Sequence, residues 1–437
     1  MKAIPCLVVL TFLTLSAYGD TAVRNESADR NHPENELLAH PAIRITVGLR
    51  EADIVGCDNR ALQAAVDYVG QLGGGVVEVG PGEYLMRDSL HMRTGVTLRG
   101  TGNETVLKKS GEVRSLLAAD GDFGECAVTV RNPEGFEIGC GVHVATKRVH
   151  GFHTICATIL NKKDNYLTLS RPLNADCMMA DEACAATIFP VISAYNVKDF
   201  RIEHVVIDGN REKNGRIDGC RGAGIFFYQG DAGIVENCAV RDYSGDGISF
   251  QQSNDVQILD CVVENCAGGG IHPGSGSQRA VVRGCKARHN DCDGFFFCWR
   301  VRNALVEDNE FCNNGATGIS IGHKDSDNII RRNVIADNAN GGVQWRDETE
   351  PMAAHNITFT ENTVRNNGRY GLSIDGQTNG TIVRKNVIES VGPNAVGIRI
   401  GMKAGDVLME DNEIRAARQV SDGRERQTPR QNPGGER

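Results

Sequence analysis

The sequence predicts an all-β chain that winds into a solenoid, a parallel β-helix of short strands stacked coil upon coil. Three observations predict this fold class. The region from Ala194 to Ala416 repeats with a period of about 24 residues, as stacked coils do. Its apolar runs are short and β-branched, which leaves no room for a helix in each repeat. The 437-residue chain also has 51 glycines but only 12 prolines, which suits many tight corners better than Pro-rich disorder.

Residues 1–19 are predicted to be a signal peptide. One positive charge, Lys2, precedes an apolar run from Ile4 to Leu15, and small residues at Ala17 and Gly19 suit cleavage after Gly19. The run is too short for a hydrocarbon core of ~30 Å. We therefore expect a secreted or periplasmic protein with no membrane span in the mature chain.

Residues 20–48 are mostly polar and carry no sustained periodic pattern, which predicts a linker. Residues 49–119 are expected to hold a helix and the first coils. After an N-cap position at Asp58, apolar residues recur with the 3.6-residue period of a helix until Gly73 ends the pattern. The stretch that follows, GGGVVEVGPGEYLMRDSLHMRTGVTLRGTG, breaks into short strands closed by Gly, Pro or Asp.

The order of these elements is a helix, GGGxVxVxPGxY, a strand ending in S-L, and then G-V-T-L-R-G-T-G. It resembles the first segment of the pectate-lyase-like superfamily of right-handed parallel β-helices. In that family the helix caps the open first coil, and a cap is useful because an uncovered coil exposes apolar core and unpaired strand edges. The resemblance covers most of residues 50–415 and implies a right-handed parallel β-helix solenoid with an N-terminal capping helix.

Two columns of residues define the repeat. The first holds Cys in the early coils and Asn in the later ones, and the second holds a Gly followed by an apolar residue. Stacking places equivalent residues ~4.8 Å apart, so the Asn column predicts an amide ladder with a structural role. The cysteines fill the same buried positions, and the glycines are expected at tight corners where φ is positive. The first column is Cys238, Cys261, Cys285, Asn309, Asn333, Asn362, Asn386 and Asn412, and the second is Gly247, Gly270, Gly294, Gly318, Gly342, Gly371 and Gly397.

Residues 120–193 interrupt the architecture without the 24-residue period. They are expected to form a small β-rich insertion that could make one wall of a binding cleft. Its cysteines are the better candidates for disulfides in an exported protein, because those of the repeat fill ladder positions. Residues 194–416 are the parallel β-helix repeats. The tail, residues 417–437, is charged and poor in apolar residues, which predicts disorder.

Chemistry is expected on an outer face of the β-helix, because the inside of a solenoid is packed. After each aligned glycine, alternate side chains point outward, and five neighbouring coils place unusual polar and aromatic residues there. Each residue alone is also explained as a solvated turn residue, but their convergence on adjacent coils favours a site. The predicted catalytic residues are Asp246, Asp293, His323, Lys324 and His272, and the predicted substrate-binding residues are Gln251, Trp299, Arg300, Arg346 and Asp347.

Three reactions fit these residue types. Glycoside hydrolysis needs two carboxyl groups at a defined separation. Asp246 and Asp293 stand two coils apart, about 9–10 Å, and Asp291 with Asp293 is a closer alternative. β-Elimination from a uronic acid needs a base and positive charge for the carboxylate, which His272, Lys324 and the arginines supply. C5 epimerisation uses the same proton abstraction and adds a donor on the other face.

The strings GDGISF and DCDGFFF, with GISIGHKD one coil later, resemble a loose form of the polygalacturonase pattern. That pattern has an acid on one coil, an acidic pair on the next, and G-H-G before S-I-G. Through this resemblance Asp246 matches the first acid and Asp293 one member of the pair. Gly294 stands in the place of the second acid, and His323 follows S-I-G instead of preceding it.

We therefore expect an exported carbohydrate-active enzyme that cleaves a uronic-acid-containing polysaccharide or oligosaccharide by lyase or hydrolase chemistry. The alternative is a non-catalytic β-helix that binds glycan or serves as a surface structural module. A net charge of −9 without Lys/Arg runs argues against a nucleic-acid partner. No cofactor and no metal ligands are assigned. Ca²⁺, which takes oxygen ligands, is compatible with the chain, but no Asp/Glu spacing requires it. We expect a monomer.

Overall fold

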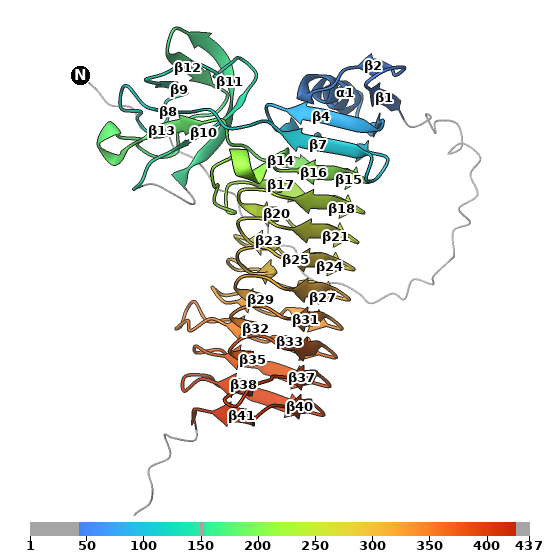
Figure 1. Ribbon diagram of the computed structural model, residues 1–437, viewed down its shortest axis with the longest axis vertical. Helices are drawn as coiled ribbons and strands as arrows, with labels where there is room; N and C mark the ends of the chain where they lie inside the picture. The colour runs from blue at the N-terminus through green and yellow to red at the C-terminus, as the bar shows by residue number, and fades with distance from the viewer. Residues whose placement is uncertain (1–42, 149–152, 425–437) are drawn as a thin grey trace, which may run out of the picture. The chain divides into compact units, whose positions relative to one another are not determined.

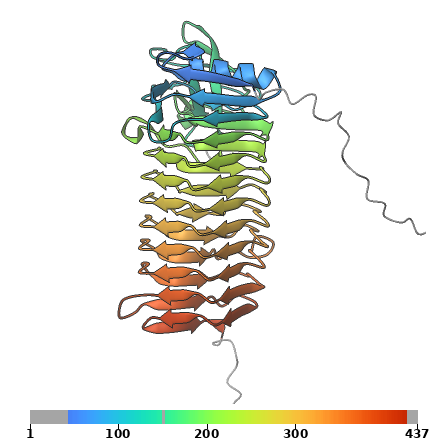
Figure 2. The ribbon, with the colours of Figure 1, turned by 90° about the vertical axis from the view of Figure 1, so that its right-hand side faces the viewer.

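The computed structural model describes residues 43–148 and 153–424, so the predicted signal peptide and most of the predicted linker lie outside the described residues. Three parallel sheets run along the β-helix, and each complete coil adds one strand to each sheet (Figures 1 and 2). The predicted all-β parallel β-helix is thereby confirmed. We call the three sheets A, B and C.

The strands of each sheet follow in their spatial order. Sheet A consists of β2 (Ile54–Val55), β1 (Arg44–Gly48), β3 (Gly75–Val79), β6 (Val96–Arg99), β15 (Arg201–Glu203), β18 (Ile234–Glu236), β21 (Gln257–Leu259), β24 (Val281–Arg283), β27 (Leu305–Glu307), β30 (Ile329–Arg331), β33 (Thr358–Thr360), β36 (Thr381–Arg384) and β39 (Val407–Glu410). Sheet B consists of β4 (Gly82–Met86), β7 (Thr105–Lys109), β16 (Val206–Asp208), β19 (Ala239–Arg241), β22 (Val262–Glu264), β25 (Lys286–Arg288), β28 (Glu310–Cys312), β31 (Val334–Ala336), β34 (Thr363–Arg365), β37 (Val387–Glu389) and β40 (Glu413–Arg415). Sheet C consists of β5 (Leu90–His91), β14 (Ile192–Lys198), β17 (Ala223–Asp231), β20 (Asp246–Gln251), β23 (Ile271–Gly274), β26 (Phe295–Phe296), β29 (Thr317–Ile321), β32 (Gly341–Trp345), β35 (Tyr370–Ile374), β38 (Val396–Ile400) and β41 (Arg418–Asp422).

The core lies between the three sheets, and its side chains stack in register. In sheet A, for example, Val235, Ile258 and Val282 are direct neighbours on successive strands, and all three are fully buried. The middle residue of each three-residue strand points inward while its two neighbours point outward. This alternation explains why the apolar runs of the sequence are short.

The predicted Asn column forms a continuous amide ladder. Asn309 Nδ2 donates to Asn333 Oδ1 at 2.9 Å, and Asn333 Nδ2 donates to Asn362 Oδ1 at the same distance. Each Asn also ties the backbone of its neighbours, and the Cys285 backbone N–H donates to Asn309 Oδ1 where the column changes from Cys to Asn. The structural assignment of this column is confirmed. A second ladder, which includes Asn314 and Asn338, runs beside it.

The expected role of the aligned glycines is wrong. Positive φ occurs instead at the residue before each ladder position, such as Asp260, Asp308 and Arg332. The aligned glycines are needed because side chains and backbone of the neighbouring strands leave no room for a Cβ. A Cβ on Gly247 would lie 2.1 Å from Val263 Cγ1, and one on Gly270 would lie 2.5 Å from the Gly294 carbonyl oxygen.

Helix α1 (Asn59–Gln71) begins where the sequence predicts. The Asp58 side chain accepts a hydrogen bond from the Arg60 backbone N–H at 3.0 Å, as an N-cap residue does. The buried face of the helix, which includes Leu62 and Val66, joins the same core as sheet A. Within residues 43–148 and 153–424, no helix has the length and apolar character needed to cross a membrane.

Three predicted boundaries are corrected. The predicted insertion starts at residue 120, but its sheet already includes Arg114–Leu116. The predicted linker reaches residue 48, but β1 (Arg44–Gly48) pairs in parallel with β3. The predicted disordered tail starts at residue 417, but β41 (Arg418–Asp422) pairs with β38, so ordered structure extends further. Backbone pairing with an existing sheet orders a segment even where its side chains are polar, because the open edge supplies hydrogen-bond partners.

The insertion forms a six-stranded sheet with antiparallel pairing and its own apolar core. It departs from the β-helix after β7 and returns at β14 (Figure 1). Its strands are β8 (Arg114–Leu116), β13 (Cys184–Ala186), β10 (Gly141–Ala145), β11 (Ile155–Lys163), β12 (Tyr166–Leu169) and β9 (Ala127–Thr129). The cysteines of the insertion were candidates for disulfides, but every cysteine in the described part of the chain is a free thiol.

Candidate active site

Three predicted catalytic residues, Asp246, His272 and Asp293, line one cavity of about 490 Å³ on the outer face of sheet C. Asp246 begins β20, His272 lies on β23, and Asp293 directly precedes Gly294 and β26. These three strands are consecutive neighbours in sheet C. The opposite wall is the connection between β16 and β17, residues 209–222, which contributes Arg216 and Cys220.

The His272 ring is fixed by the Asp246 carboxylate. His272 Nδ1 lies 2.5 Å from Asp246 Oδ2, and the other carboxylate oxygen accepts the Gly269 backbone N–H at 2.6 Å. Burial disfavours the imidazolium, but the interactions with Asp246 and Cys220 together outweigh burial and raise the pKa of His272 to about 10. Two glycines make room for this pair, since a Cβ on Gly219 or Gly268 would come within 2.0 Å of the carboxylate.

Asp293 occupies a different electrostatic environment. Its Oδ1 accepts hydrogen bonds from the backbone N–H of Thr317, at 2.9 Å, and from the Thr317 hydroxyl. Burial nevertheless raises the pKa of Asp293, because it outweighs the hydrogen bonds from Thr317 that favour the ionised form. A half-buried carboxyl group with a raised pKa is suited to donate a proton.

A group of possible metal ligands borders the same cavity. The ligand atoms of Cys220, His272 and Cys298 lie within 4.8 Å of one another. In the described part of the chain, these three form the one such group of His, Cys, Asp or Glu. The sequence does not predict this group, because its three residues come from different coils and their spacing along the chain matches no metal-binding motif.

His323 and Arg346 belong to a network beside the cavity, and neither lines it. His323 Nε2 lies 2.7 Å from Glu348 Oε1, and its Nδ1 lies 2.9 Å from the Cys298 carbonyl oxygen. Arg346 donates to the Ser320 hydroxyl, at 2.8 Å, and its guanidinium covers the Phe296 ring.

Arg346 is also the cationic partner of a buried carboxyl group. Its Nη2 lies 3.4 Å from Oδ2 of Asp325, which is fully buried. Burial raises the pKa of Asp325 to about 7, although the Arg346 charge opposes the rise. Both Arg346 and His323 therefore have structural partners where the sequence predicted contacts with substrate or reacting atoms.

The other predicted residues lie away from the cavity. Trp299 stacks with the exposed Arg300, whose guanidinium carbon lies 4.9 Å from the indole centroid. The backbone N–H of Lys324 bonds the Met352 carbonyl, and the Lys324 side chain does not line the cavity. Asp347 is exposed, pairs with Lys403 at 3.0 Å and lines a separate hollow near the end of sheet C.

Gln251 is corrected as a substrate-binding residue, because its side chain is fully buried. Its Nε2 donates to the Ser249 hydroxyl at 3.0 Å. The side chain lies along sheet C beside Gly274, where a Cβ would come within 2.6 Å of the Gln251 Oε1. Because Gly274 has no side chain, the Gln251 amide fits beside it and is shielded from solvent.

A groove lies between the insertion and sheet C, so the insertion makes one wall of a cleft as the sequence predicted, but the residues of this groove were not predicted. Two cavities of about 280 and 350 Å³ meet there and share Cys156, Arg171 and Tyr195. The Arg171 guanidinium covers the Tyr195 ring at 3.6 Å, and Arg221 lies over Tyr228 at 5.7 Å. Aromatic faces and guanidinium groups together suit acidic sugars. These residues come from separate elements, so no spacing in the sequence unites them.

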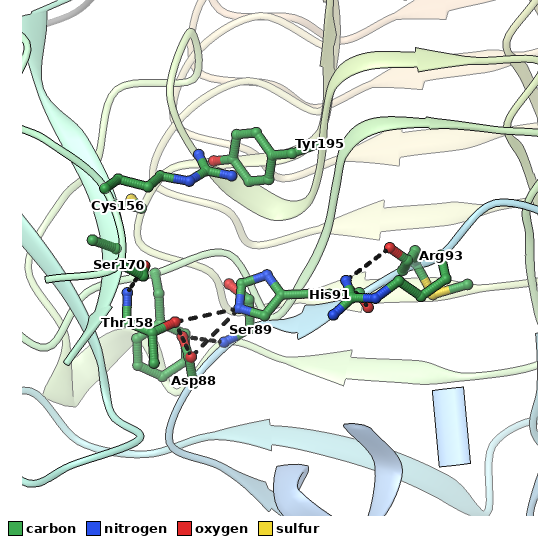
Figure 3. A pocket seen from close by; sticks show the side chains of 12 residues that line it. Asp88, Ser89, His91, Arg93, Cys156, Thr158, Ser170 and Tyr195 are labelled. Atoms are coloured by element: carbon green, nitrogen blue, oxygen red, sulfur yellow. Dashed lines mark hydrogen bonds and ion pairs between the residues drawn. The ribbon is translucent and has the colours of Figure 1, made fainter. Parts of the chain in front are cut away.

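The inner end of this groove holds a second polar cluster (Figure 3). His91 lies between Asp88, 3.4 Å from Nε2, and Ser193, 2.8 Å from Nδ1. Thr158 donates to the same Asp88 carboxylate at 2.6 Å. Ser193 is fully buried, so its hydroxyl group cannot reach a substrate, and the cluster joins the insertion to the β-helix.

Comparison with known proteins agrees with the fold. The family model described as "right handed beta helix region" matches residues 174–299, 203–356 and 272–388. None of the curated proteins compared matches the chain.

Among solved structures, the A-module of the mannuronan C-5 epimerase AlgE4 from Azotobacter vinelandii is 16% identical, with a TM-score of 0.51, over 86% of this chain and 97% of that one. A protein described as a glycoside hydrolase is 12% identical, with a TM-score of 0.52, over 85% and 96%. The Dettilon tailspike protein is 11% identical, with a TM-score of 0.54, over 83% and 59%. At these identities the likeness establishes the fold and leaves the reaction to be argued from the site.

Proposed function

Because the chain is a right-handed parallel β-helix protein, as its resemblance to the pectate-lyase-like superfamily implies, we propose that it hydrolyses an acidic glycan at the cavity of Asp246, His272 and Asp293. One observation carries the proposal. Two carboxyl groups share this cavity in different environments, one hydrogen-bonded to an imidazole and one half-buried with a raised pKa. Pairs of carboxyl groups with such contrasting surroundings are the signature of acid and base roles.

Asp293 is the general acid of this mechanism. It protonates the glycosidic oxygen as the bond to the sugar carbon breaks, and Asp246 accepts a proton from the water that attacks that carbon. The strands of the two residues are separated by one strand, which gives about 9–10 Å between equivalent positions. That separation lies at the upper end of the range for inverting hydrolysis, in which a water molecule fits between base and sugar.

His272 favours hydrolysis over the two alternative reactions. β-Elimination and C5 epimerisation both begin with a base that removes the C5 proton. The raised pKa of His272 makes it a weak candidate for that base near neutral pH. Lys324, the other candidate, does not line the cavity.

An acidic substrate is supported by the cationic groups near the cavity. Arg216 lines its wall, and Arg171 and Arg221 cover tyrosine rings in the adjoining groove. Guanidinium groups bind carboxylates in a two-point geometry. The signal-peptide pattern of residues 1–19 supports export, where a polysaccharide substrate is accessible.

The test is incubation of the purified protein with a panel of uronic-acid and neutral polysaccharides. Hydrolysis gives new reducing ends without the ultraviolet absorbance of a new C=C bond, whereas elimination gives both. Asp293→Asn should abolish the release of reducing ends, while Asp255→Asn, at an exposed acid paired with Arg279, should leave it unchanged. Absorbance from a C=C bond, or full activity of Asp293→Asn, contradicts the proposed mechanism.

The groove also supports the second candidate function, glycan binding without turnover. Tyr195, Tyr228 and the two arginines form a platform that needs no carboxylate chemistry. If the protein binds an acidic oligosaccharide in calorimetry but releases no product from any member of the panel, the binding function replaces the enzymatic one.

A further inference from the structure

We propose that Cys220, His272 and Cys298 form a binding site for one Zn²⁺ ion, a function distinct from the glycan chemistry proposed above. Cysteine thiolates and imidazole nitrogen are the ligands that zinc prefers in proteins. The three side chains come from the connection between β16 and β17, from β23, and from the residues after β26. Folding alone brings them together, since 78 residues separate the two cysteines.

The spacing of the two sulfur atoms fits a shared metal ion. Cys220 Sγ lies 3.8 Å from Cys298 Sγ. Two thiolates bound at about 2.3 Å to a tetrahedral zinc ion stand about 3.8 Å apart, which follows from the tetrahedral angle. A disulfide needs a separation of about 2.05 Å, so the two thiols are free and stand at a distance that one zinc ion can bridge without movement of either sulfur.

His272 supplies the third ligand atom. Its side chain is 5% exposed, and its Nε2 is buried without a hydrogen-bond partner in the described part of the chain. An unpartnered buried ring nitrogen is costly. A ring nitrogen of His272 lies within 4.8 Å of the two sulfurs, and Nε2 is the one that is not bound to a carboxylate. The opposite nitrogen, Nδ1, is held by Asp246. A carboxylate on the far nitrogen is the usual way in which a metal-binding histidine is oriented.

The other buried cysteines of the β-helix have different surroundings. Cys261 Sγ lies 3.2 Å from the Leu259 carbonyl oxygen, and Cys285 Sγ lies 3.4 Å from the Ile258 carbonyl oxygen. These thiols are occupied by the backbone at ladder positions. The ladder thiol of Cys261 also interacts with the thiols of Cys238 and Cys285, but within the described residues only Cys220 and Cys298 form a three-ligand group with a histidine.

Binding of Zn²⁺ at this site releases protons from the ligand side chains. Both thiols become thiolates as they bind, their protons pass to solvent, and a proton on His272 Nε2 leaves as well. Three protein ligands leave the fourth tetrahedral position open. Because Cys220 and His272 also line the cavity, a water molecule from the cavity would complete the coordination.

The experiment uses the full-length protein, reduced and freed of metal, and titrated separately with Zn²⁺ and with Co²⁺ as a spectroscopic probe. We expect one ion per chain, thiolate-to-cobalt charge-transfer absorbance, and displacement of Co²⁺ by Zn²⁺. Cys220→Ser and Cys298→Ser should each lose both the absorbance and tight binding. Cys261→Ser, which removes a buried thiol outside the cluster, should retain both.

Two further variants sharpen the assignment. His272→Gln should weaken Zn²⁺ binding strongly, and Asp246→Asn should weaken it about 10- to 100-fold, as the loss of an orienting carboxylate does. The proposal is overturned if the reduced protein binds no Zn²⁺, or if Cys298→Ser binds it as tightly as the unaltered chain. The metal-binding test measures absorbance and metal content, so a negative result does not contradict the proposed hydrolysis. Equally, a protein that cleaves no glycan can still bind Zn²⁺ at this site.

Discussion

The Nδ1 atom of His272 lies 2.5 Å from the Oδ2 atom of Asp246, which joins side chains of two neighbouring coils on the outer face of sheet C. This contact serves both proposed functions. It holds the Asp246 carboxylate at the cavity for hydrolysis, and it occupies His272 Nδ1, which leaves Nε2 as the nitrogen for the proposed ion.

The first prediction concerns the glycine that leaves room for this contact. A Cβ on Gly219 would lie 1.8 Å from Asp246 Oδ2 and 2.7 Å from His272 Nδ1. Gly219→Ala must displace the pair, and a displacement of about 1 Å in catalytic geometry costs about 100-fold in rate. We expect kcat to fall by about that factor, measured with the best substrate of the panel. Gly111→Ala, where the nearest atom is 3.6 Å away, is the matched control, and equal activity of the two variants would refute the role of this contact.

The second prediction concerns the pH dependence of hydrolysis. The proposed acid, Asp293, works in its protonated form, so kcat/KM should fall as pH increases through its raised pKa. The Thr317 hydroxyl donates to this carboxylate and favours its ionised form. Thr317→Val should therefore move the falling limb to higher pH. A limb that stays in place or moves to lower pH would exclude Asp293 as the acid.

The third prediction tests the groove. Tyr228 is half-buried next to Arg221 and Tyr195, on the strand beside β20. Loss of its ring removes a stacking surface without touching the proposed acid and base, so Tyr228→Ala should raise KM several-fold with little change in kcat. Tyr166→Ala, at an exposed ring of the insertion, is the control. A fall in kcat with unchanged KM would place Tyr228 in the chemistry instead of in binding.

The fourth prediction concerns the amide ladder. Asn333 accepts hydrogen bonds from Asn309 and donates to Asn362 and to the Val306 carbonyl, and it is fully buried. Truncation leaves several buried groups without partners, each at a cost of about 1–3 kcal/mol. Asn333→Ala should lower the free energy of unfolding by at least about 2 kcal/mol, measured by urea denaturation.

The control for the ladder is Asn394→Ala, which truncates an exposed amide and should change stability by less than about 0.5 kcal/mol. Similar midpoints for the two variants would mean that the ladder is not a major source of stability.

The sequence was most informative about features that repeat. One coil does not reveal its fold, but successive apolar triplets with Asn and Gly at matching positions specify the stacking, because equivalent residues must meet every ~4.8 Å. The Asn309 and Asn333 ladder and the N-cap at Asp58 were therefore predictable. The positions of the aligned glycines were predicted correctly, but the reason for them was not. They avoid clashes with atoms from other strands, and such contacts leave no pattern in the neighbouring sequence.

The candidate site was predicted in part for the same reason. Asp246, His272 and Asp293 lie near equivalent positions of successive coils, so the repeat itself brings them to one cavity. His323, Arg346 and Gln251 follow the same pattern, yet their environments depend on side-chain partners such as Glu348 and Ser249. Alternation along a strand predicts which face a side chain points to, but not whether that face is covered.

The sequence by itself thus determined the β-helix, its cap and the coils that carry the carboxyl groups, because periodicity along the chain becomes proximity across a solenoid. Only the tertiary structure decided the groove of Arg171, Tyr195 and Tyr228 and the cluster of Cys220, His272 and Cys298. Both depend on the insertion or on the long connection between β16 and β17 folding back over sheet C. Neither segment follows the repeat, so its contacts are set by packing and burial and not by spacing in the chain.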